Sequence, residues 1–293
     1  MTAETALQAF IAWAVDFGWN WLWLLLLVPV IAVWRATAGV RRRAKERERV
    51  AHTRRDRLAR LQSRRRSRVI AIVHKEEMLP GFPFPVRGHI RQDDAEQVLA
   101  TIRATNPAKP LDIILHTPGG FVLHALQIAR AIKAHPAKKT VFVPHLAMSG
   151  GTLIALAADE IVMSDHAVLG PIDPQLAGAP AASWVKVARE KPIAAIQDET
   201  LLLADMSQKV LDQMRKQACE LMQGNYSHDG SCAISDLLAS GKWSHDYPIT
   251  VPEAKELGLH VSTDMPADVI ELTALLAASN IRQPSVHTTP GKV

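Results

Sequence analysis

Short apolar runs alternate with amphipathic segments along most of the chain after residue 68. β-Branched apolar runs predict buried strands at 69–73, 111–115, 140–143 and 161–163. Apolar residues spaced three and four apart predict helices at 93–105, 121–134 and 152–158. Strands that alternate with helices are typical of a parallel sheet with helices on its faces. We therefore predict an α/β fold with a mainly parallel sheet.

The pattern becomes mainly helical after residue 198. A long helix, a polar loop and two short helices are predicted at 199–223, 225–231, 233–239 and 252–257. The last of these starts with Pro in its first turn and ends at Gly258, as short helices commonly do. The tail after Asn280 is rich in Pro and Thr, and we expect it to be disordered.

An apolar segment lies near the other end of the chain, at residues 17–34. None of its side chains is ionisable, and Trp residues lie toward both of its ends. A bilayer core of about 30 Å needs about 20 helical residues, with a lower limit near 17, and Trp is enriched at membrane interfaces. We predict one transmembrane helix here. A cleaved signal peptide is not expected, because positive charge follows the segment instead of preceding it.

Basic residues are concentrated immediately after that segment. Residues 35–68 contain 15 Lys and Arg and three acidic residues, so the remainder of the chain is acidic although the formal net charge is +5. The positive-inside rule places everything from Arg35 onward in the cytoplasm. We expect a single-pass inner-membrane protein with a cytoplasmic catalytic domain, in which residues 17–68 bind membrane lipids. Nucleic-acid binding is not expected, since the basic segment has no interleaved aromatic residues.

The composition excludes several classes of protein. Cys219 and Cys232 are too few for a disulfide framework in a chain of 293 residues. The sequence has no Cys-x-x-Cys or His-Glu-x-x-His motif, so we expect no metal site. It also has no Gly-x-Gly-x-x-Gly dinucleotide fingerprint, and we expect no cofactor.

Two glycine pairs follow consecutive predicted strands, and ligands gather at this edge of a parallel sheet. The residues expected to line the site are Gly119, Gly120, His145, Ser149, Gly150 and Gly151. Ser149 stands at a strand-to-helix junction, where a hydroxyl can act as a nucleophile. The N–H groups of Gly120 and Gly150 can form an oxyanion hole, because glycine lets the backbone come close to a bound oxygen.

Three blocks carry a resemblance to a known family. They are LHTPGGFVLHALQIARAI (115–132), VPHLAMSGGTLIALAADEIVMSDHAVLGPIDPQ (143–175) and GKWSHDYPITVPEAKELGL (241–259). In these blocks the chain resembles the ClpP/crotonase-like serine peptidases, and most closely the membrane-anchored serine dehydrogenase proteinases, which are related to signal peptide peptidase SppA. The similarity covers roughly residues 69–265.

The resemblance implies hydrolysis of peptide bonds by a serine nucleophile, without a cofactor. Ser149 falls on the family's nucleophile, and Gly120 and Gly150 fall on its oxyanion donors. An extended peptide substrate would lie beside the segment from Val141 to Ala147. The resemblance also implies a homo-oligomer. An unfolding motor would be a separate chain, because no ATP-binding motif is present.

The general base stays open between a lysine and a histidine. Lys209 is the first choice, because apolar neighbours in its helix could desolvate it and lower its pKa. Lys191 is a second choice and Lys186 a third. The position of the ClpP catalytic histidine falls near Asp173, where no histidine stands, whereas Asp246 falls on the ClpP aspartate and His245 adjoins it. These two residues form the non-lysine alternative.

The functional prediction is a membrane-anchored, ATP-independent serine endopeptidase. The alternatives are a crotonase-like acyl-CoA enzyme, which needs no serine nucleophile, and a catalytically inactive membrane scaffold. The predicted organisation is a short N-terminal segment, a transmembrane helix, a basic linker, a catalytic domain and a C-terminal helix with a disordered tail, at 1–16, 17–34, 35–68, 69–265 and 266–293.

Overall fold

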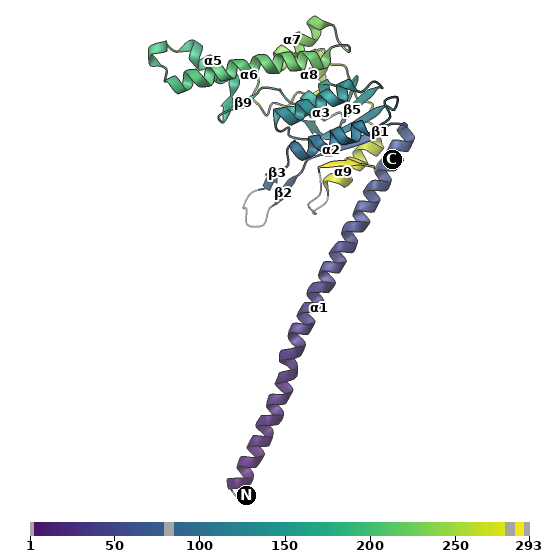
Figure 1. Cartoon of the computed structure of the whole chain (residues 1–293), viewed down its shortest axis with the longest axis vertical. Coiled ribbons are helices and arrows are strands. Elements are labelled where there is room, and N and C mark those ends of the chain that lie inside the picture. Colours follow the sequence, from purple (N-terminus) through teal and green to yellow (C-terminus); the bar gives the residue numbers. More distant parts are fainter. Residues whose placement is uncertain (1–2, 79–84, 279–284, 290–293) are drawn as a thin grey trace. The chain divides into compact units, whose positions relative to one another are not determined.

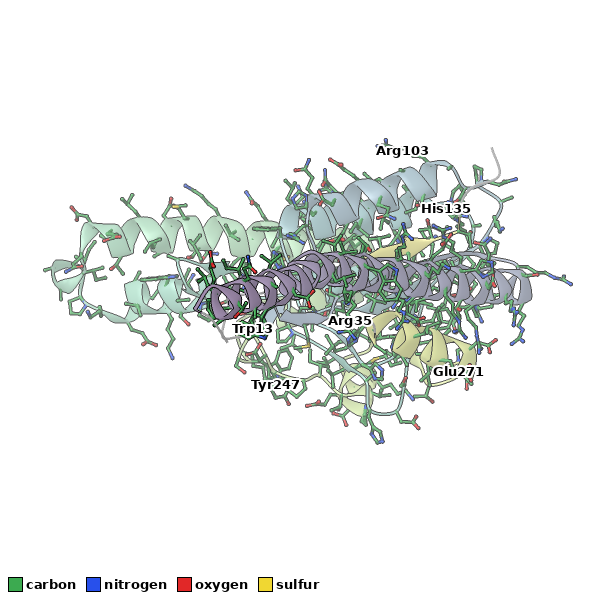
Figure 2. The ribbon with its side chains drawn as sticks, turned by 90° about the horizontal axis from the view of Figure 1, so that it is seen from below. Trp13, Arg35, Arg103, His135, Tyr247 and Glu271 are labelled. Atoms are coloured by element: carbon green, nitrogen blue, oxygen red, sulfur yellow. A yellow bond between two sulfur atoms is a disulfide. The ribbon has the colours of Figure 1, made fainter. Side chains whose placement is uncertain are left out.

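The computed structural model describes residues 3–78, 85–278 and 285–289. The chain divides into two units, residues 1–53 and 54–293, which are described separately. One helix, α1 (Ala3–Arg65), contributes to both units. In the first unit, α1 carries Trp13, which stacks on Phe17 with ring centroids 5.1 Å apart, and the exposed Arg35 (Figure 2).

A six-stranded sheet forms the centre of the second unit, with the strand order β11-β7-β5-β4-β1-β12. Its strands are β1 (Arg68–Val73), β4 (Leu111–His116), β5 (Lys139–Val143), β7 (Glu160–Met163), β11 (Val261–Ser262) and β12 (Val286–Thr288). All adjacent pairs are parallel except β1 and β12, which are antiparallel. The predicted α/β class with a mainly parallel sheet is confirmed.

Helices cover both faces of this sheet (Figure 1). On one face, Ile70, Ile72 and their neighbours pack against α2 (Gln92–Arg103), α3 (Val122–Ala134) and α4 (Gly150–Leu156). The alternate residues Val69, Ala71 and Val73 point to the other face, where α9 (Ala267–Ala277) packs. Since both faces are covered, the strands are continuous apolar runs instead of alternating patterns.

The last turns of α1 also cover this second face. Leu58 and Leu61 are buried in the cluster that contains α9, and Arg57 pairs with Glu271 at 3.0 Å. Arg65 pairs with the buried Asp112 on β4. The globular unit therefore begins near residue 54, and not at residue 69 as predicted, because the apolar face of this basic helix is part of the core.

A helical arm projects from the sheet (Figure 1). It consists of α5 (Ala181–Glu190), the 3₁₀ turn η1 (Ile193–Ala195) and α6 (Asp198–Met222). Two shorter helices follow, α7 (His228–Leu238) and α8 (Val251–Glu256). The predicted helices of this region are all present, but α7 begins five residues earlier than expected and takes up part of the predicted polar loop.

Three small two-stranded sheets complete the unit. They pair β2 (Glu76–Met78) with β3 (Pro85–Arg87), β6 (Leu146–Ala147) with β8 (Val168–Leu169), and β9 (Gln175–Leu176) with β10 (Ala179–Pro180). The β6–β8 pair positions two residues of the candidate site, because β6 is followed closely by Ser149 and β8 by Asp173.

One other expectation differs from the structure, and one bond was not expected from the sequence. The tail expected to be disordered contains β12, whose register pairs Ala71 with His287; residues 279–284 and 290–293 lie outside the described residues. Cys219 and Cys232, too few for a disulfide framework, are nevertheless bonded to each other and join α6 to α7.

The predicted transmembrane segment lies inside α1. The side chains of residues 19–26, 28 and 29 are outside the described residues. Across the residues that the structure does describe, no helix combines the length and the apolar character of a membrane span.

Candidate active site

Ser149 occupies a sharp turn between β6 and α4. Its backbone angles are φ 50° and ψ −112°, a combination that costs an L-residue about 1–3 kcal/mol and is found at functional sites. The Gly151 N–H donates to the Met148 carbonyl at 2.7 Å and closes the turn. A strained serine between a strand and a helix is the geometry of a nucleophile elbow, which exposes the hydroxyl.

Glycine is required at both positions after Ser149. A Cβ at Gly150 would lie 2.9 Å from the Cβ of Ala125 on α3, and one at Gly151 would lie 2.6 Å from Thr117 Cγ2. The two glycines therefore let the start of α4 pack closely against α3 and the chain that leaves β4.

The second glycine pair touches the serine turn. Gly119 has φ +104°, and a Cβ there would lie 2.9 Å from the Ser149 Cβ. The Gly120 N atom lies 3.6 Å from the position of a Cβ on Gly150. The structure thus brings together Gly119, Gly120, Ser149, Gly150 and Gly151, as the two motifs predict.

The N–H groups of Gly120 and Gly150 have no backbone acceptor in the described part of the chain. Gly150 is the first residue of α4, where an N–H has no acceptor inside the helix. Gly120 forms a bridge to Ile90 through the residues on either side of it. The Ile90 N–H donates to the Gly119 carbonyl and the Phe121 N–H donates to the Ile90 carbonyl, so the bridge does not use the Gly120 N–H. Two free donors beside a serine are what an oxyanion hole requires.

A buried polar chain supports the Gly119–Gly120 turn from behind. His74 Nε2 lies 3.2 Å from Asp94 Oδ2, and His74 Nδ1 lies 2.9 Å from Thr117 Oγ1. The Gly119 N–H donates to the same Thr117 oxygen at 3.1 Å. Burial raises the pKa of Asp94, but hydrogen bonds from His74 and the Arg91 N–H outweigh it and leave the pKa below its ordinary value. Sequence reasoning missed this chain, which joins three separate segments.

Two histidines lie at the ends of neighbouring strands. The rings of His116 and His145 meet edge to face, with centroids 5.4 Å apart, and His145 is exposed. Burial, and then the charges of His145 and His74, lower the pKa of His116 to about 4. His116 is therefore neutral at physiological pH, and its imidazole adds no positive charge to the site.

A histidine–carboxylate pair stands beyond β8. His245 Nδ1 lies 2.9 Å from Oδ1 of Asp173, whose side chain is fully buried. The hydrogen bond to Asp173 raises the pKa of His245 above its ordinary value, burial opposes the shift, and the charges of Asp173 and Asp246 add to it. Gln175 donates to the other carboxylate oxygen at 2.7 Å. This arrangement leaves the Nε2 atom of His245 free to exchange a proton.

The segment that carries Asp173 is attached to the serine turn. The Gly170 N–H donates to the Ala147 carbonyl at 3.3 Å, and Thr152 Oγ1 lies 2.8 Å from the carbonyl oxygens of both residues. A Cβ at Gly170 would lie 2.7 Å from the Met148 Cε. Asp173 therefore follows, within three residues, a backbone that contacts both sides of Ser149.

The other candidate bases have different surroundings. Lys209 pairs with Asp205 one turn earlier on α6, and its side chain is 67% exposed, so the burial expected to desolvate it is not present in this chain. Lys186 makes a similar pair with Glu190, and Lys191 is exposed at the end of α5.

The acidic partner of His245 also differs from the prediction. Asp246 is exposed, and Asp173 is the carboxylate that forms a hydrogen bond with His245. The sequence offered one signal for Asp173, because an acidic residue inside the apolar segment 168–174 is expected to be buried and to need a partner.

Comparison with known proteins decides the family. The sequence model of one family, described as the ClpP-like SDH-type serine proteinase, matches residues 18–293. The chain belongs to this family. It is accordingly a serine peptidase, and the resemblance seen in the three sequence blocks is confirmed.

Two curated relatives come from Methanocaldococcus jannaschii. Uncharacterized protein MJ0137 is 49% identical over 218 residues, which cover 74% of this chain and 76% of the relative. Uncharacterized protein MJ1495 is 45% identical over 230 residues, which cover 78% of each chain.

Solved structures with a similar arrangement include two peptidases. An alanine variant of the 1510-N membrane-bound stomatin-specific protease is 18% identical, covers 68% of this chain and 82% of its own, and superposes with a TM-score of 0.43. ClpP1 from Listeria monocytogenes is 18% identical, and the match covers 67% of this chain and 92% of ClpP1. The two superpose with a TM-score of 0.42.

Proposed function

We propose that this serine peptidase is an endopeptidase that works through an acyl-enzyme on Ser149. The observation that carries the proposal is the contact between the strained Ser149 turn and the Gly119–Gly120 turn. That contact supports an oxyanion hole made by the Gly120 and Gly150 N–H groups, which can stabilise the oxyanion of a tetrahedral intermediate.

His245, oriented by Asp173, is the proposed general base. In the first step its Nε2 atom takes the Ser149 proton while the serine oxygen bonds to the substrate carbonyl carbon. The negative charge on the carbonyl oxygen is held by the N–H groups of Gly120 and Gly150. Next, His245 gives the proton to the leaving amine as the peptide C–N bond breaks, and water then hydrolyses the acyl-enzyme by the same sequence.

The pairing geometry favours His245 over the lysines. A base must be held in place by a third group, and Asp173 holds His245 through a hydrogen bond of 2.9 Å at a fully buried carboxylate. Lys209 is instead exposed on the arm and paired with Asp205. A Ser–Lys dyad with Lys209 or Lys191 remains the alternative that experiment must exclude.

The surroundings of the glycine turn support an extended, apolar peptide as substrate. Phe121 directly follows Gly120 and is 58% exposed. Leu123, two residues further along, is 64% exposed. A peptide that pairs with the strand edge next to the site would place alternate side chains against these residues.

Membrane attachment through α1 is part of the proposal. Large apolar side chains are exposed along this helix in its own unit, namely Leu7, Phe10, Ile11, Trp13, Val15, Phe17, Leu27, Val30, Ile31, Val33 and Trp34. Asp16 is the one ionisable residue from 5 to 34. Such a helix is stabilised in lipid, and the basic residues that follow would bind anionic headgroups on the cytoplasmic side of the inner membrane. We also propose that the chain forms a homo-oligomer.

A single substitution tests the proposed activity. Ser149→Ala should abolish hydrolysis of unfolded protein and peptide substrates, a loss of at least about 10⁴-fold as expected for a nucleophile. Ser164→Ala, at the end of the neighbouring strand β7, is the matched control and should retain activity. Unchanged hydrolysis in Ser149→Ala would contradict the proposal. An acyl-CoA activity that survives Ser149→Ala would instead support the crotonase-like alternative.

A further inference from the structure

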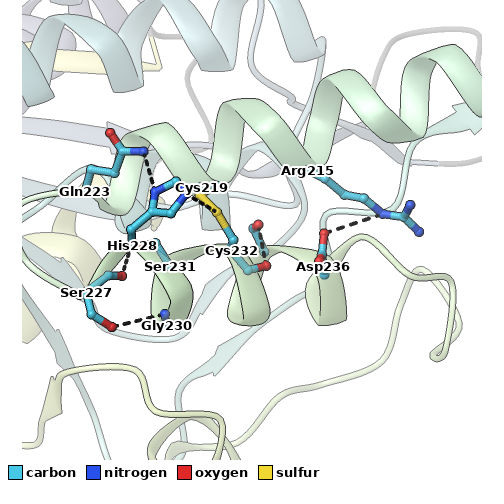
Figure 3. The surroundings of a disulfide bond; sticks show 10 residues. Arg215, Cys219, Gln223, Ser227, His228, Gly230, Ser231, Cys232 and Asp236 are labelled. Atoms are coloured by element: carbon cyan, nitrogen blue, oxygen red, sulfur yellow. Dashed lines mark hydrogen bonds and ion pairs between the residues drawn. A yellow bond between two sulfur atoms is a disulfide. The ribbon is translucent and has the colours of Figure 1, made fainter.

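We propose that Cys219, His228 and Cys232 form a thiolate-containing site for a zinc-like divalent metal ion, available when the Cys219–Cys232 bond is reduced. The site lies between α6 and α7 (Figure 3) and does not depend on the proposed peptidase activity. Among the residues that the structure describes, this is the group of metal-ligating side chains that comes close enough to hold one ion.

The spacing of the three ligand atoms supports one shared ion. The two sulfur atoms and a His228 ring nitrogen all lie within 4.8 Å of one another, and Cys232 Sγ lies 3.9 Å from His228 Nε2. In a tetrahedral zinc site, with bonds of about 2.0–2.3 Å, ligand atoms lie about 3.5–4 Å apart. The thiolates reach such a separation once the S–S bond is broken, and the cysteine Cα atoms are 4.6 Å apart.

The helical positions give the ligands a common direction. His228 and Cys232 are four residues apart on α7 and therefore lie on the same face. Cys219 is buried on the facing side of α6. Two ligands from one helix and one from its neighbour leave the fourth position for water or a further ligand.

The side chain of Gln223 contacts the His228 ring. The Gln223 side-chain amide lies 3.3 Å from His228 Nδ1 (Figure 3). Amide oxygen and nitrogen are assigned by context, so with the amide turned over its oxygen accepts from Nδ1–H. This contact leaves the Nε2 lone pair directed toward the sulfur atoms. A ligating histidine commonly donates its other ring N–H to such an acceptor.

The two helices stay together without the disulfide. Met222, Ile234 and Leu238 are buried in the main core, and Ser227 caps α7 by accepting from the Gly230 N–H. Arg215 and Asp236 form an ion pair at 3.9 Å one turn further along (Figure 3). Reduction therefore opens the bond between the sulfur atoms while the ligands remain in place.

The disulfide and the metal exclude each other. Two electrons and two protons, supplied by a thiol reductant, convert the disulfide into two thiols, and the metal displaces both protons when the thiolates bind it. The site therefore holds metal in a reducing compartment and a disulfide in an oxidising one. In an intracellular enzyme a cysteine pair is more often metal-binding than disulfide-bonded.

Titration of the purified full-length chain with Co²⁺, followed by absorbance, tests the proposal. After reduction with a dithiol and removal of the reductant without air, we expect one Co²⁺ per chain. Thiolate-to-cobalt charge-transfer bands and the visible bands of tetrahedral Co²⁺ should appear, and Zn²⁺ should remove them. The oxidised chain should show none of these bands.

Variants identify the ligands. Cys219→Ser and Cys232→Ser should each abolish tight binding, and His228→Ala should weaken it at least tenfold. Gln223→Ala keeps all three ligands and should weaken binding by a smaller factor. His124→Ala is the matched control, because His124 pairs with Gln127 in a similar way on α3, and it should bind Co²⁺ like wild type. Absence of the charge-transfer bands in the reduced wild type, or unchanged binding in His228→Ala, would overturn the proposal.

Discussion

The pairing of His245 with Asp173 determines how the proposed site should respond to pH. A general base must be neutral to accept the serine proton. The hydrogen bond to Asp173 raises the pKa of His245 above its ordinary value of 6.5, so the imidazole stays protonated to a higher pH than a free histidine. The rate should therefore fall as the pH is lowered, with a midpoint above 6.5.

Two substitutions test this assignment through the pH profile of kcat/KM. His245→Gln should lower the rate by about 10²–10⁴-fold, as removal of a general base does. Asp173→Asn should lower the rate and also move the acidic midpoint downward, because the charge that favours the imidazolium is gone. A midpoint that does not move in Asp173→Asn would assign the base to a lysine, with Lys191→Ala and Lys209→Ala as the next variants.

At the residue level, sequence reasoning identified what short motifs encode. Ser149, Gly119, Gly120 and Gly150 could be predicted because adjacent glycines indicate unusual backbone angles and close approaches. The pairing of Asp173 with His245 could not be predicted, because the two residues are 72 positions apart in the sequence. Only the folded chain shows which acid lies beside which histidine.

Among the elements, the polar chain from Asp94 through His74 to Thr117 connects α2 to the residues that directly follow β1 and β4. It holds the Gly119 N–H and thereby the turn that carries the proposed oxyanion donor, the Gly120 N–H. We predict that Thr117→Val lowers kcat by about 10–100-fold with little change in KM, since a small misplacement of an oxyanion donor acts on the transition state.

A matched substitution separates this effect from general destabilisation. Thr140→Val replaces another buried threonine, on β5, and should leave kcat unchanged. The affinity of a peptide boronate, which mimics the tetrahedral intermediate, should fall in Thr117→Val by the same factor as kcat/KM. An equal loss in both variants, or a change confined to KM, would contradict the supporting role of this chain.

The main parallel strands and the helices that follow them could be predicted because each is encoded locally. These strands are apolar runs and these helices have a regular apolar spacing. Two of the elements that were missed, β12 and the last turns of α1, depend on distant partners. β12 is short, and the partner that orders it lies more than 200 residues away on β1. The last turns of α1 carry Leu58 and Leu61 among many arginines, so their buried face was hidden by the charge of the surrounding residues.

For the whole molecule, we predict attachment to a membrane. The full chain should sediment with membranes and resist extraction by high salt, because an apolar helix is held by lipid and not by charge alone. Val30→Arg combined with Ile31→Arg should release much of the protein, since each arginine within a span costs about 2.5–3.5 kcal/mol.

Two further variants complete that measurement. Val40→Arg places the same charge on an exposed position beyond the proposed span and should leave membrane association unchanged. A reporter fused after Val293 should be protected from protease in intact cells if the catalytic unit faces the cytoplasm. Wild-type protein that remains soluble, or that is released by salt, would contradict the anchor.

Long-range organisation was the least accessible from the sequence. The hydropathy of residues 17–34 and the charge of residues 35–68 indicate a membrane-proximal segment. They do not show that helix α1 continues without a break from Ala3 to Arg65 and enters the core of the second unit. The last turns of α1 pack against α9, which lies more than 200 residues away along the chain.

Trapping the covalent intermediate tests the central claim most directly. The enzyme would be quenched in acid during turnover of a peptide ester, digested with a protease, and its peptides analysed by mass spectrometry. We predict the acyl group of the substrate on Ser149, and no acylated peptide in Ser149→Ala. An acyl group on another residue, or turnover by Ser149→Ala at the wild-type rate, would contradict the account.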